Sequence, residues 1–353
     1  MTTLFDPVQL GALVLKNRIV MAPMTRSRAG ANDVPTAWQV EYYRQRASAG
    51  LIVAEGTHPG PDGKGYCRTP GIYTAAQING WRAVTDAVHA AGGRIVLQLM
   101  HCGRIAHPAN KDATAETVAP SAIPARGKIY TESGMQPFAS PRALRLEEIP
   151  QVIGEYRQAT KNALAAGFDG VELHCTSGYL PAQFLSTGTN QRSDRYGGPV
   201  ENRIRFVIET LQAMNEAAGA DRVGWRICPA NPFNDLQDDD PAATFAALLQ
   251  AVTPMQQAYL HLVYLPQLPV DGLKLVQENY RGALILNDSL NFETASHAIG
   301  QGIAAAASFG RYYVSNPDLV ERFRQGAKLA SFDTATLYTD GPEGYIDYPG
   351  LPG

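Results

Sequence analysis

The sequence predicts an α/β protein folded as a (β/α)8 TIM barrel, and two features of the 353-residue chain predict it. Eight short apolar runs recur along the chain, and most are rich in Val, Ile and Leu, as strands covered on both faces should be. The runs lie at residues 18–24, 51–56, 94–100, 169–175, 222–228, 258–264, 282–288 and 303–310. Longer amphipathic stretches separate them, for example residues 74–93 and 146–167, and several end in Gly, the usual helix stop.

A doubly wound open sheet is the competing architecture for alternating strands and helices. Such a sheet normally carries a Gly-rich GxGxxG turn, and this sequence has none. The length would allow two domains, but barrels of this class commonly reach it as one domain. We therefore expect residues 1–353 to form a single TIM-barrel domain.

Three segments outside the strand and helix pattern also have predicted roles. Residues 4–18 are typical of a small β-hairpin that could close the barrel floor. Residues 103–146 form a long Pro/Ser/Thr-rich excursion after the third strand, and a loop of that length is usually functional, often an active-site lid. The polar tail after about residue 327 contains three tyrosines, so we expect it to pack on the barrel.

Composition excludes several classes of function. The chain has 30 Lys and Arg against 33 Asp and Glu, and the resulting formal charge of −3 argues against a partner that is nucleic acid or an anionic membrane. No apolar run reaches the ~18–20 residues needed to span a bilayer, and the N-terminus lacks the features of a signal peptide. These observations predict a cytoplasmic protein, and we expect a monomer or a homodimer. The four cysteines, Cys67, Cys102, Cys175 and Cys228, form no CxxC pair, so we expect buried thiols and no metal site.

Polar residues recur where the predicted strands end, which is where barrels of this class carry their chemistry. Thr25 follows the first run, Gln98 lies in the third, His174 ends the fourth, Arg226 lies in the fifth, and Arg311 follows the eighth. Each has an ordinary structural explanation, since Gln98 could be a satisfied core amide and Arg226 a buried ion-pair partner. Together they predict a site for a polar, anionic ligand.

The segment after the eighth run indicates a phosphate. Gly310 and Arg311 follow the strand, and Ser315-Asn316-Pro317 is a typical N-cap and first position of a following helix. Phosphate sites in these barrels lie after strands seven and eight, where backbone N–H groups and a helix N-terminus face the anion. Arg311 would supply a bidentate partner for it.

Eight blocks of this chain form a longer pattern than any single motif. They are NRIVMAPMTRSRA (17–29), YYRQRASAGLIVAEGT (42–57), LQLMHCGRIAHP (97–108), SAIPARGKIYT (121–131), AGFDGVELHCTSGYLPAQFL (166–185), NQRSDRYGGPVENRIRF (190–206), FGRYYVSNPDLVERF (309–323) and LYTDGPEGYIDYP (337–349). Together these blocks resemble the Old Yellow Enzyme family of FMN-dependent ene-reductases. The resemblance is collinear over essentially the whole chain. It implies a flavin-binding barrel that reduces the activated C=C bond of α,β-unsaturated carbonyl or related compounds with NADPH or NADH.

Two other functions stay open on the sequence. A flavin-dependent dehydrogenase or isomerase of a biosynthetic pathway would use the same barrel, and a barrel without flavin could serve as a binding protein.

The resemblance implies FMN contacts for Pro23, Met24, Thr25, Gly56, Gln98, Arg226, Ser289, Gly310 and Arg311. It assigns substrate binding to His174, Ser177 and Tyr338, and it makes Tyr179 the proton donor, a sensible role for a phenol that stays protonated at pH 7.

The sequence departs from the family pattern at four places. Ser177 stands where Asn or His is usual, and its shorter side chain leaves His174 to bind most of the substrate oxygen. Asn287-Asp288-Ser289 replaces Asn-Gly-Gly, which places a carboxylate where a phosphate would be repelled unless the carboxylate points away. The segment around Arg226, WRICPANPFND, lacks the usual serines, and Tyr264 stands where an acidic residue is common.

Overall fold

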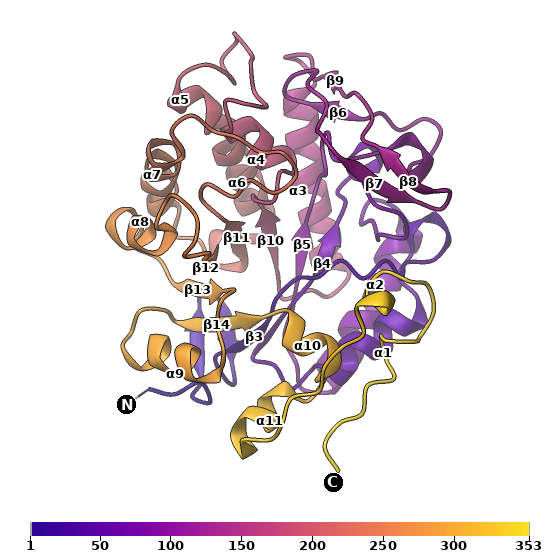
Figure 1. The fold of residues 1–353 in the computed structure, drawn as a ribbon, viewed down its shortest axis with the longest axis vertical. Helices are drawn as coiled ribbons and strands as arrows, with labels where there is room; N and C mark the ends of the chain where they lie inside the picture. Colours follow the sequence, from indigo (N-terminus) through magenta and orange to yellow (C-terminus); the bar gives the residue numbers. More distant parts are fainter. Residues whose placement is uncertain (1, 353) are drawn as a thin grey trace.

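The computed structural model describes residues 2–352, and its centre is a closed barrel of parallel strands (Figure 1). In barrel order the strands are β3 (Ile19–Met21), β4 (Leu51–Thr57), β5 (Ile95–Leu99), β10 (Gly170–His174), β11 (Val223–Ile227), β12 (Tyr259–Val263), β13 (Leu284–Asn287) and β14 (Ala306–Phe309). Each strand lies inside one of the eight predicted runs, except that β4 extends one residue beyond its run, to Thr57. The prediction of a (β/α)8 barrel is therefore confirmed.

Helices surround the barrel on its outer face (Figure 1). They are α1 (Ala37–Gln45), α2 (Ala75–Ala90), α3 (Ile149–Ala165), α4 (Leu180–Leu185), α5 (Val200–Arg203), α6 (Arg205–Ala218), α7 (Pro241–Val252), α8 (Gly272–Asn279), α9 (Phe292–Gly300), α10 (Arg311–Ser315) and α11 (Leu319–Gln325). The predicted helical stretches 74–93 and 146–167 correspond to α2 and α3. Within residues 2–352, no helix has the length and apolar character required to cross a bilayer.

The predicted N-terminal hairpin is present and covers the floor of the barrel. β1 (Val8–Leu10) and β2 (Leu13–Leu15) pair antiparallel. Leu10, Leu13 and Leu15 are buried in one apolar cluster with residues from the barrel strands, including Val20, Leu51, Val96 and Tyr259. The hairpin therefore seals the end of the barrel opposite the strand ends that carry the polar residues.

The excursion after β5 is ordered and contains strands of its own. β6 (Val118–Ala119) pairs with β9 (Arg142–Ala143), and β7 (Lys128–Thr131) forms a hairpin with β8 (Gly134–Pro137). Figure 1 shows this segment standing beside the barrel at the mouth formed by β4, β5 and β10. Buried Arg104 anchors the excursion to the loop after β11, because its guanidinium donates to the Asp235 carbonyl at 2.7 Å.

The C-terminal tail packs on the barrel, as its tyrosines predicted. Tyr345 is fully buried and stacks on Tyr42 of α1, with ring centroids 4.0 Å apart. Arg26, which follows β3, donates to the carbonyls of Leu337 at 3.0 Å and Gly344 at 2.7 Å. The tail therefore lies across the segment that joins β3 to α1.

The prediction that Ser315-Asn316-Pro317 begins a helix is wrong. α10 ends at Ser315, and α11 begins at Leu319. The Ser315 hydroxyl donates to the Ala330 carbonyl at 2.7 Å, and the Asn316 amide donates to the same oxygen at 3.2 Å. Both side chains hold the tail, so neither caps a helix. The helix that follows β14 starts directly at Arg311 and has five residues.

The four cysteines are buried free thiols, as the sequence predicted. Cys175 and Cys228 directly follow β10 and β11 and lie outside the cavity described below.

Candidate active site

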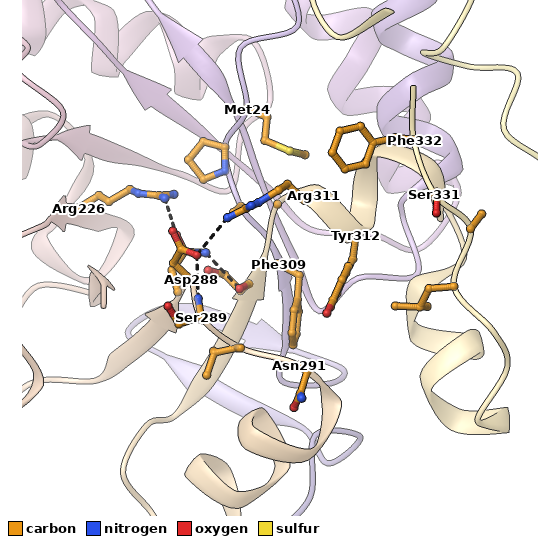
Figure 2. A pocket seen from close by; sticks show the side chains of 18 residues that line it. Met24, Arg226, Asp288, Ser289, Asn291, Phe309, Arg311, Tyr312, Ser331 and Phe332 are labelled. Carbon is orange, nitrogen blue, oxygen red and sulfur yellow. Dashed lines mark hydrogen bonds and ion pairs between the residues drawn. The ribbon is translucent and has the colours of Figure 1, made fainter. Parts of the chain in front are cut away.

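The carboxyl ends of the barrel strands open into a cavity of about 750 Å³ (Figure 2). Residues after β3, β13 and β14, together with the tail at 329–332, form its wall. Six of the predicted cofactor residues line it, namely Pro23, Met24, Arg226, Ser289, Gly310 and Arg311. A volume of this size suits a drug-sized ligand or cofactor.

The other three predicted cofactor residues lie outside this lining. Thr25 directly follows Met24 and is half-buried. Gly56 is buried in β4, and a Cβ atom placed there would lie 2.5 Å from the sulfur of Met100, so a side chain would displace that residue. Gln98 is buried inside β5.

Gln98 belongs to a chain of polar side chains inside the barrel. Its Nε2 donates to Glu172 Oε1 of β10 at 2.8 Å, and Glu172 Oε2 lies 2.8 Å from Nδ1 of His261 on β12. His261 Nε2 lies 2.7 Å from the Ser308 hydroxyl on β14. Because all four residues are buried, these bonds fix the amide of Gln98 in one orientation. One N–H of the amide is thereby engaged, which leaves the Gln98 carbonyl oxygen and the second N–H for a ligand.

The pKa shifts along this series of hydrogen-bonded side chains favour a charged carboxylate beside a neutral imidazole. Burial, followed by the charge of Arg226, lowers the pKa of His261. Burial alone would raise the pKa of Glu172, but His261, Arg226 and the hydrogen bond from Gln98 outweigh it and lower this pKa. The negative charge of Glu172 therefore acts on Arg226 and helps to keep its partly buried guanidinium charged.

Arg226 is the partly buried cation at the inner end of the cavity. Its Nη2 donates to Asn287 Oδ1 at 2.6 Å, and Nη1 is buried with no hydrogen-bond partner among residues 2–352. Burial lowers the pKa of Arg226, while the Glu172 carboxylate opposes that shift. The interpretation of Arg226 as an ion-pair partner does not hold, because its direct partner is an amide. An unpaired buried N–H is costly, so this donor is suited to a ligand oxygen.

At the outer end of the cavity, the turn after β13 brings Asp288 to Arg311. Asp288 and Ser289 both have left-handed backbones, with φ of 66° and 50°. Asp288 Oδ1 accepts from the Ser289 N–H at 2.7 Å and lies 3.4 Å from Arg311 Nη2 (Figure 2). The Arg311 side chain is otherwise 76% exposed. The carboxylate thus points toward the predicted phosphate-binding groups.

His174 and Tyr179 lie together at the end of β10. Their rings meet edge to face with centroids 4.8 Å apart, and His174 Nδ1 is buried without a hydrogen-bond partner within the described residues. Burial, followed by the charge of Arg226, lowers the pKa of His174 to about 3, so the imidazole is neutral at pH 7. Burial raises the pKa of Tyr179 well above its usual value, so the phenol keeps its proton.

A second tyrosine contacts the hydroxyl of Tyr179. Tyr66, from the segment between β4 and α2, places its hydroxyl 3.0 Å from that of Tyr179. Tyr338 is 60% exposed, and its backbone carbonyl accepts from Arg68 at 2.9 Å. Burial, and to a smaller degree the Tyr338 phenol, raises the pKa of both Tyr66 and Tyr179. Tyr338 therefore lies near this pair, although its ring faces largely outward.

Ser177 occupies a left-handed turn between β10 and α4, with φ of 58°. Its carbonyl accepts from Asn234 Nδ2 at 2.8 Å, and its hydroxyl makes no hydrogen bond within the described part of the chain. The loop after β11 therefore holds the backbone of this turn and leaves the side chain unconstrained.

The excursion packs on the residues around Tyr179. Tyr179 is buried in a small apolar cluster with Met100, Cys102, Ile105 and Ala125, and Phe138 and Tyr66 pack against it. Ile105 and Ala125 of the excursion therefore pack directly on the cluster that holds Tyr179, and the assignment of residues 103–146 as an active-site segment stays a prediction.

Sequence reasoning missed Glu172, His261, Ser308 and Tyr66. The first three were recognisable in principle as polar residues inside apolar strand runs, where a charged side chain demands a partner. Tyr66 had no such signal, because it lies in a loop 113 residues from Tyr179.

Comparisons with known proteins agree with this geometry. Residues 3–330 match the model of the NADH:flavin oxidoreductase / NADH oxidase family. The chain belongs to this family. A probable flavin mononucleotide-dependent alkene reductase of Leishmania infantum is 42% identical, with 98% of this chain and 97% of the relative aligned. A 12-oxophytodienoate reductase (number 7) of Oryza sativa subsp. japonica is 39% identical over 99% of this chain and 94% of its own length.

Solved structures agree as closely. Morphinone reductase in complex with tetrahydroNAD has a TM-score of 0.95 and 44% identity, and the match covers all of this chain and 98% of that one. The old yellow enzyme homologue of Zymomonas mobilis also has a TM-score of 0.95, with 40% identity and 99% of each chain covered. The chain is therefore an FMN-dependent oxidoreductase of the Old Yellow Enzyme type that uses NAD(P)H, as the resemblance implied.

The residues present fit FMN. The buried Arg226 Nη1 lacks a partner, and it lies at one end of a cavity whose other end holds Arg311 and the backbone of Ser289. A cation with a free N–H suits the carbonyl-rich edge of a flavin, and the outer end has donors for a phosphate.

Proposed function

We propose that this chain reduces the C=C bond of α,β-unsaturated carbonyl compounds, with His174 binding the carbonyl oxygen and Tyr179 delivering a proton to the adjacent carbon. The observation that carries this proposal is the pair itself. His174 and Tyr179 lie 4.8 Å apart between ring centroids, and burial keeps the imidazole neutral and the phenol protonated. A neutral N–H polarises the carbonyl, and a protonated phenol is a suitable acid for the carbon that becomes electron-rich.

A bound FMN would supply the hydride for the far carbon of the alkene, with NADH or NADPH as the source of that hydride. Thr25 and Gln98 would hold the pyrimidine edge of the flavin, and Arg226 would favour negative charge at the neighbouring carbonyl. Pro23, Met24 and Gly56 would offer backbone contacts to the ring. Ser289, Gly310 and Arg311 would hold the phosphate. Support for these roles comes from the cavity that six of these nine residues share.

The substrate would be a small molecule held against Tyr338 and the excursion. The reductases named for alkenes, 12-oxophytodienoate and morphinone among the relatives support a conjugated carbonyl as the reacting group. In this proposal, residues 1–353 act as one flavin-binding domain. The cytoplasmic location and the monomeric or homodimeric state stay predictions.

Replacing the proton donor tests the proposal. Purified protein should show a flavin absorbance spectrum that bleaches on anaerobic titration with NADPH or NADH. Tyr179→Phe should slow turnover of an enone by at least about tenfold and leave the rate of flavin bleaching unchanged, because the phenol acts only after the flavin is reduced. Tyr130→Phe is the matched control. Tyr130 lies in β7, is 47% exposed and is outside the apolar cluster that holds Tyr179, so this change should alter neither rate. Equal turnover by the wild type and Tyr179→Phe would refute the assignment and make solvent the acid.

A further inference from the structure

The phosphate end of the cavity carries an unusual charge arrangement. Among the described residues that line the cavity, Arg226 and Arg311 are the cations and Asp288 is the one carboxylate. A flavin phosphate bears about −1.5 to −2 charges at pH 7, so a site for it normally gathers donors and excludes acids. Here an acid lies among the donors.

The backbone conformation of Asp288 sets the direction of its carboxylate. The left-handed φ of 66° is a region that Asp tolerates because its short side chain can hydrogen-bond locally. That local bond is present, since Oδ1 accepts from the Ser289 N–H at 2.7 Å. The conformation that makes Asp acceptable in this turn therefore also directs its carboxylate toward the donors at the phosphate end of the cavity.

The same oxygen reaches the second donor. Asp288 Oδ1 lies 3.4 Å from Nη2 of Arg311, and Figure 2 shows the carboxylate between Ser289 and that guanidinium. Its charge also acts on Arg226 at the inner end of the cavity, where it adds to Glu172 in opposing the effect of burial on the arginine pKa. One carboxylate thus contacts two groups that the phosphate would need, the Ser289 N–H and Arg311, and partly offsets the charge of Arg226, the other cation of the cavity.

We propose that Asp288 is an internal competitor for the flavin phosphate and sets how strongly this chain prefers FMN over riboflavin. The phosphate must displace the carboxylate from the Ser289 N–H and Arg311 and then remain beside it. Riboflavin has the same ring system without the phosphate, so its binding does not require that exchange. This proposal rests on the placement of FMN given above.

The test measures cofactor affinity rather than turnover. Flavin is removed from the purified protein by dialysis against a chaotropic salt, and the apoprotein is titrated with FMN and, separately, with riboflavin while flavin fluorescence is followed. Asp288→Asn keeps an acceptor for the Ser289 N–H and suits the left-handed turn, but it removes the charge. It should tighten FMN by about tenfold or more and change riboflavin by less than about twofold. Asp288→Gly, which removes both charge and acceptor, should do the same.

A nearby carboxylate provides the control. Glu293, in the first turn of α9, is exposed and outside the cavity lining. Glu293→Gln therefore removes one negative charge without changing a residue at the phosphate end of the cavity. It should leave the ratio of the FMN and riboflavin dissociation constants within about twofold of the wild type. An equal shift of this ratio in Glu293→Gln and Asp288→Asn would overturn the proposed competition and assign the effect to the overall charge of the protein.

The remaining outcomes also decide the question. An unchanged ratio in Asp288→Asn and Asp288→Gly, with both flavins binding, overturns the proposal and leaves the enone reduction untouched. If neither flavin binds any variant, the placement of FMN fails together with the proposal. Slow enone turnover alone bears on Tyr179 and His174 and does not enter this test.

Discussion

Replacing Ser177 with Asn tests how the site holds its substrate. Ser177 lies three residues after His174 in the turn between β10 and α4, with φ of 58°. Asn is among the residues most tolerant of left-handed backbone, so the turn needs no rearrangement. The bond from Asn234 is made to the backbone carbonyl of residue 177, and it therefore survives the substitution.

The expected gain follows from the donors available at that position. A Ser hydroxyl offers one donor on a short arm, whereas an Asn amide offers two donors further from the backbone. A neutral hydrogen bond contributes a net of about 0.5–1.5 kcal/mol, and a donor that meets charge developing on a substrate oxygen contributes up to about 2.7–4 kcal/mol. Because His174 supplies only a neutral N–H, we expect Ser177→Asn to raise kcat/KM for cyclohexenone by about tenfold, with about 10³ as the upper limit.

The assay is steady-state reduction of cyclohexenone with saturating NADPH, compared with the rate of flavin bleaching under anaerobic conditions. Ser177→Asn should change the first rate and leave the second unchanged, since residue 177 is assigned to the carbonyl rather than to the cofactor. Ser177→Ala should stay within about twofold of the wild type, because the hydroxyl does not bind the substrate oxygen in this account. His174→Ala should nearly abolish cyclohexenone reduction.

Two results would contradict this reasoning. One is fast cyclohexenone reduction by the wild type together with no effect of Ser177→Asn, which would mean that residue 177 does not face the substrate. The other is a loss in Ser177→Ala comparable to that in His174→Ala, which would make the serine hydroxyl a working part of the carbonyl site.

Two further predictions concern groups that sequence reasoning did not single out. Tyr66→Phe removes the hydroxyl 3.0 Å from that of Tyr179 and should lower kcat for an enone several-fold with little change in KM, because Tyr66 orients the acid and does not bind substrate; an unchanged kcat would deny it that role. Burial, reinforced by Asp62, raises the pKa of Glu155 to about 7. The contribution of this carboxyl to the free energy of unfolding is therefore greatest below the ordinary pKa of 4.5 and is lost as pH rises through 7, because the buried carboxyl must then ionise. Glu155→Gln should therefore gain roughly 1–2 kcal/mol of unfolding free energy relative to the wild type between pH 5 and pH 8, measured by urea titration, and a gap that does not widen would contradict the shift.

The barrel was predictable because its pattern is local. An apolar run such as residues 51–56 must be covered on both faces, and eight such runs separated by helices leave few architectures. The positions of Arg226 and Arg311 followed from the rule that strand ends meet at one mouth, and both line the cavity. The failed helix start at Ser315 shows the limit of local reasoning. A good capping residue also bonds a carbonyl well, and the tail at Ala330 competed for its hydroxyl.

The interior of the site depended on register and direction, which the letters do not carry. Glu172 pairs with His261 because β10 and β12, which flank β11, bring their inward-facing side chains together across the barrel. At Asp288, the sequence allowed the carboxylate to point either toward the phosphate or away from it. Two successive left-handed residues decide that choice, since they place the side chain beside the Ser289 N–H and Arg311. Glycines at the same turn would adopt these angles without a carboxylate, so the backbone geometry of this turn does not require the acid. What the acid adds is charge at the phosphate end of the cavity, and for that reason the comparison of FMN with riboflavin isolates its effect.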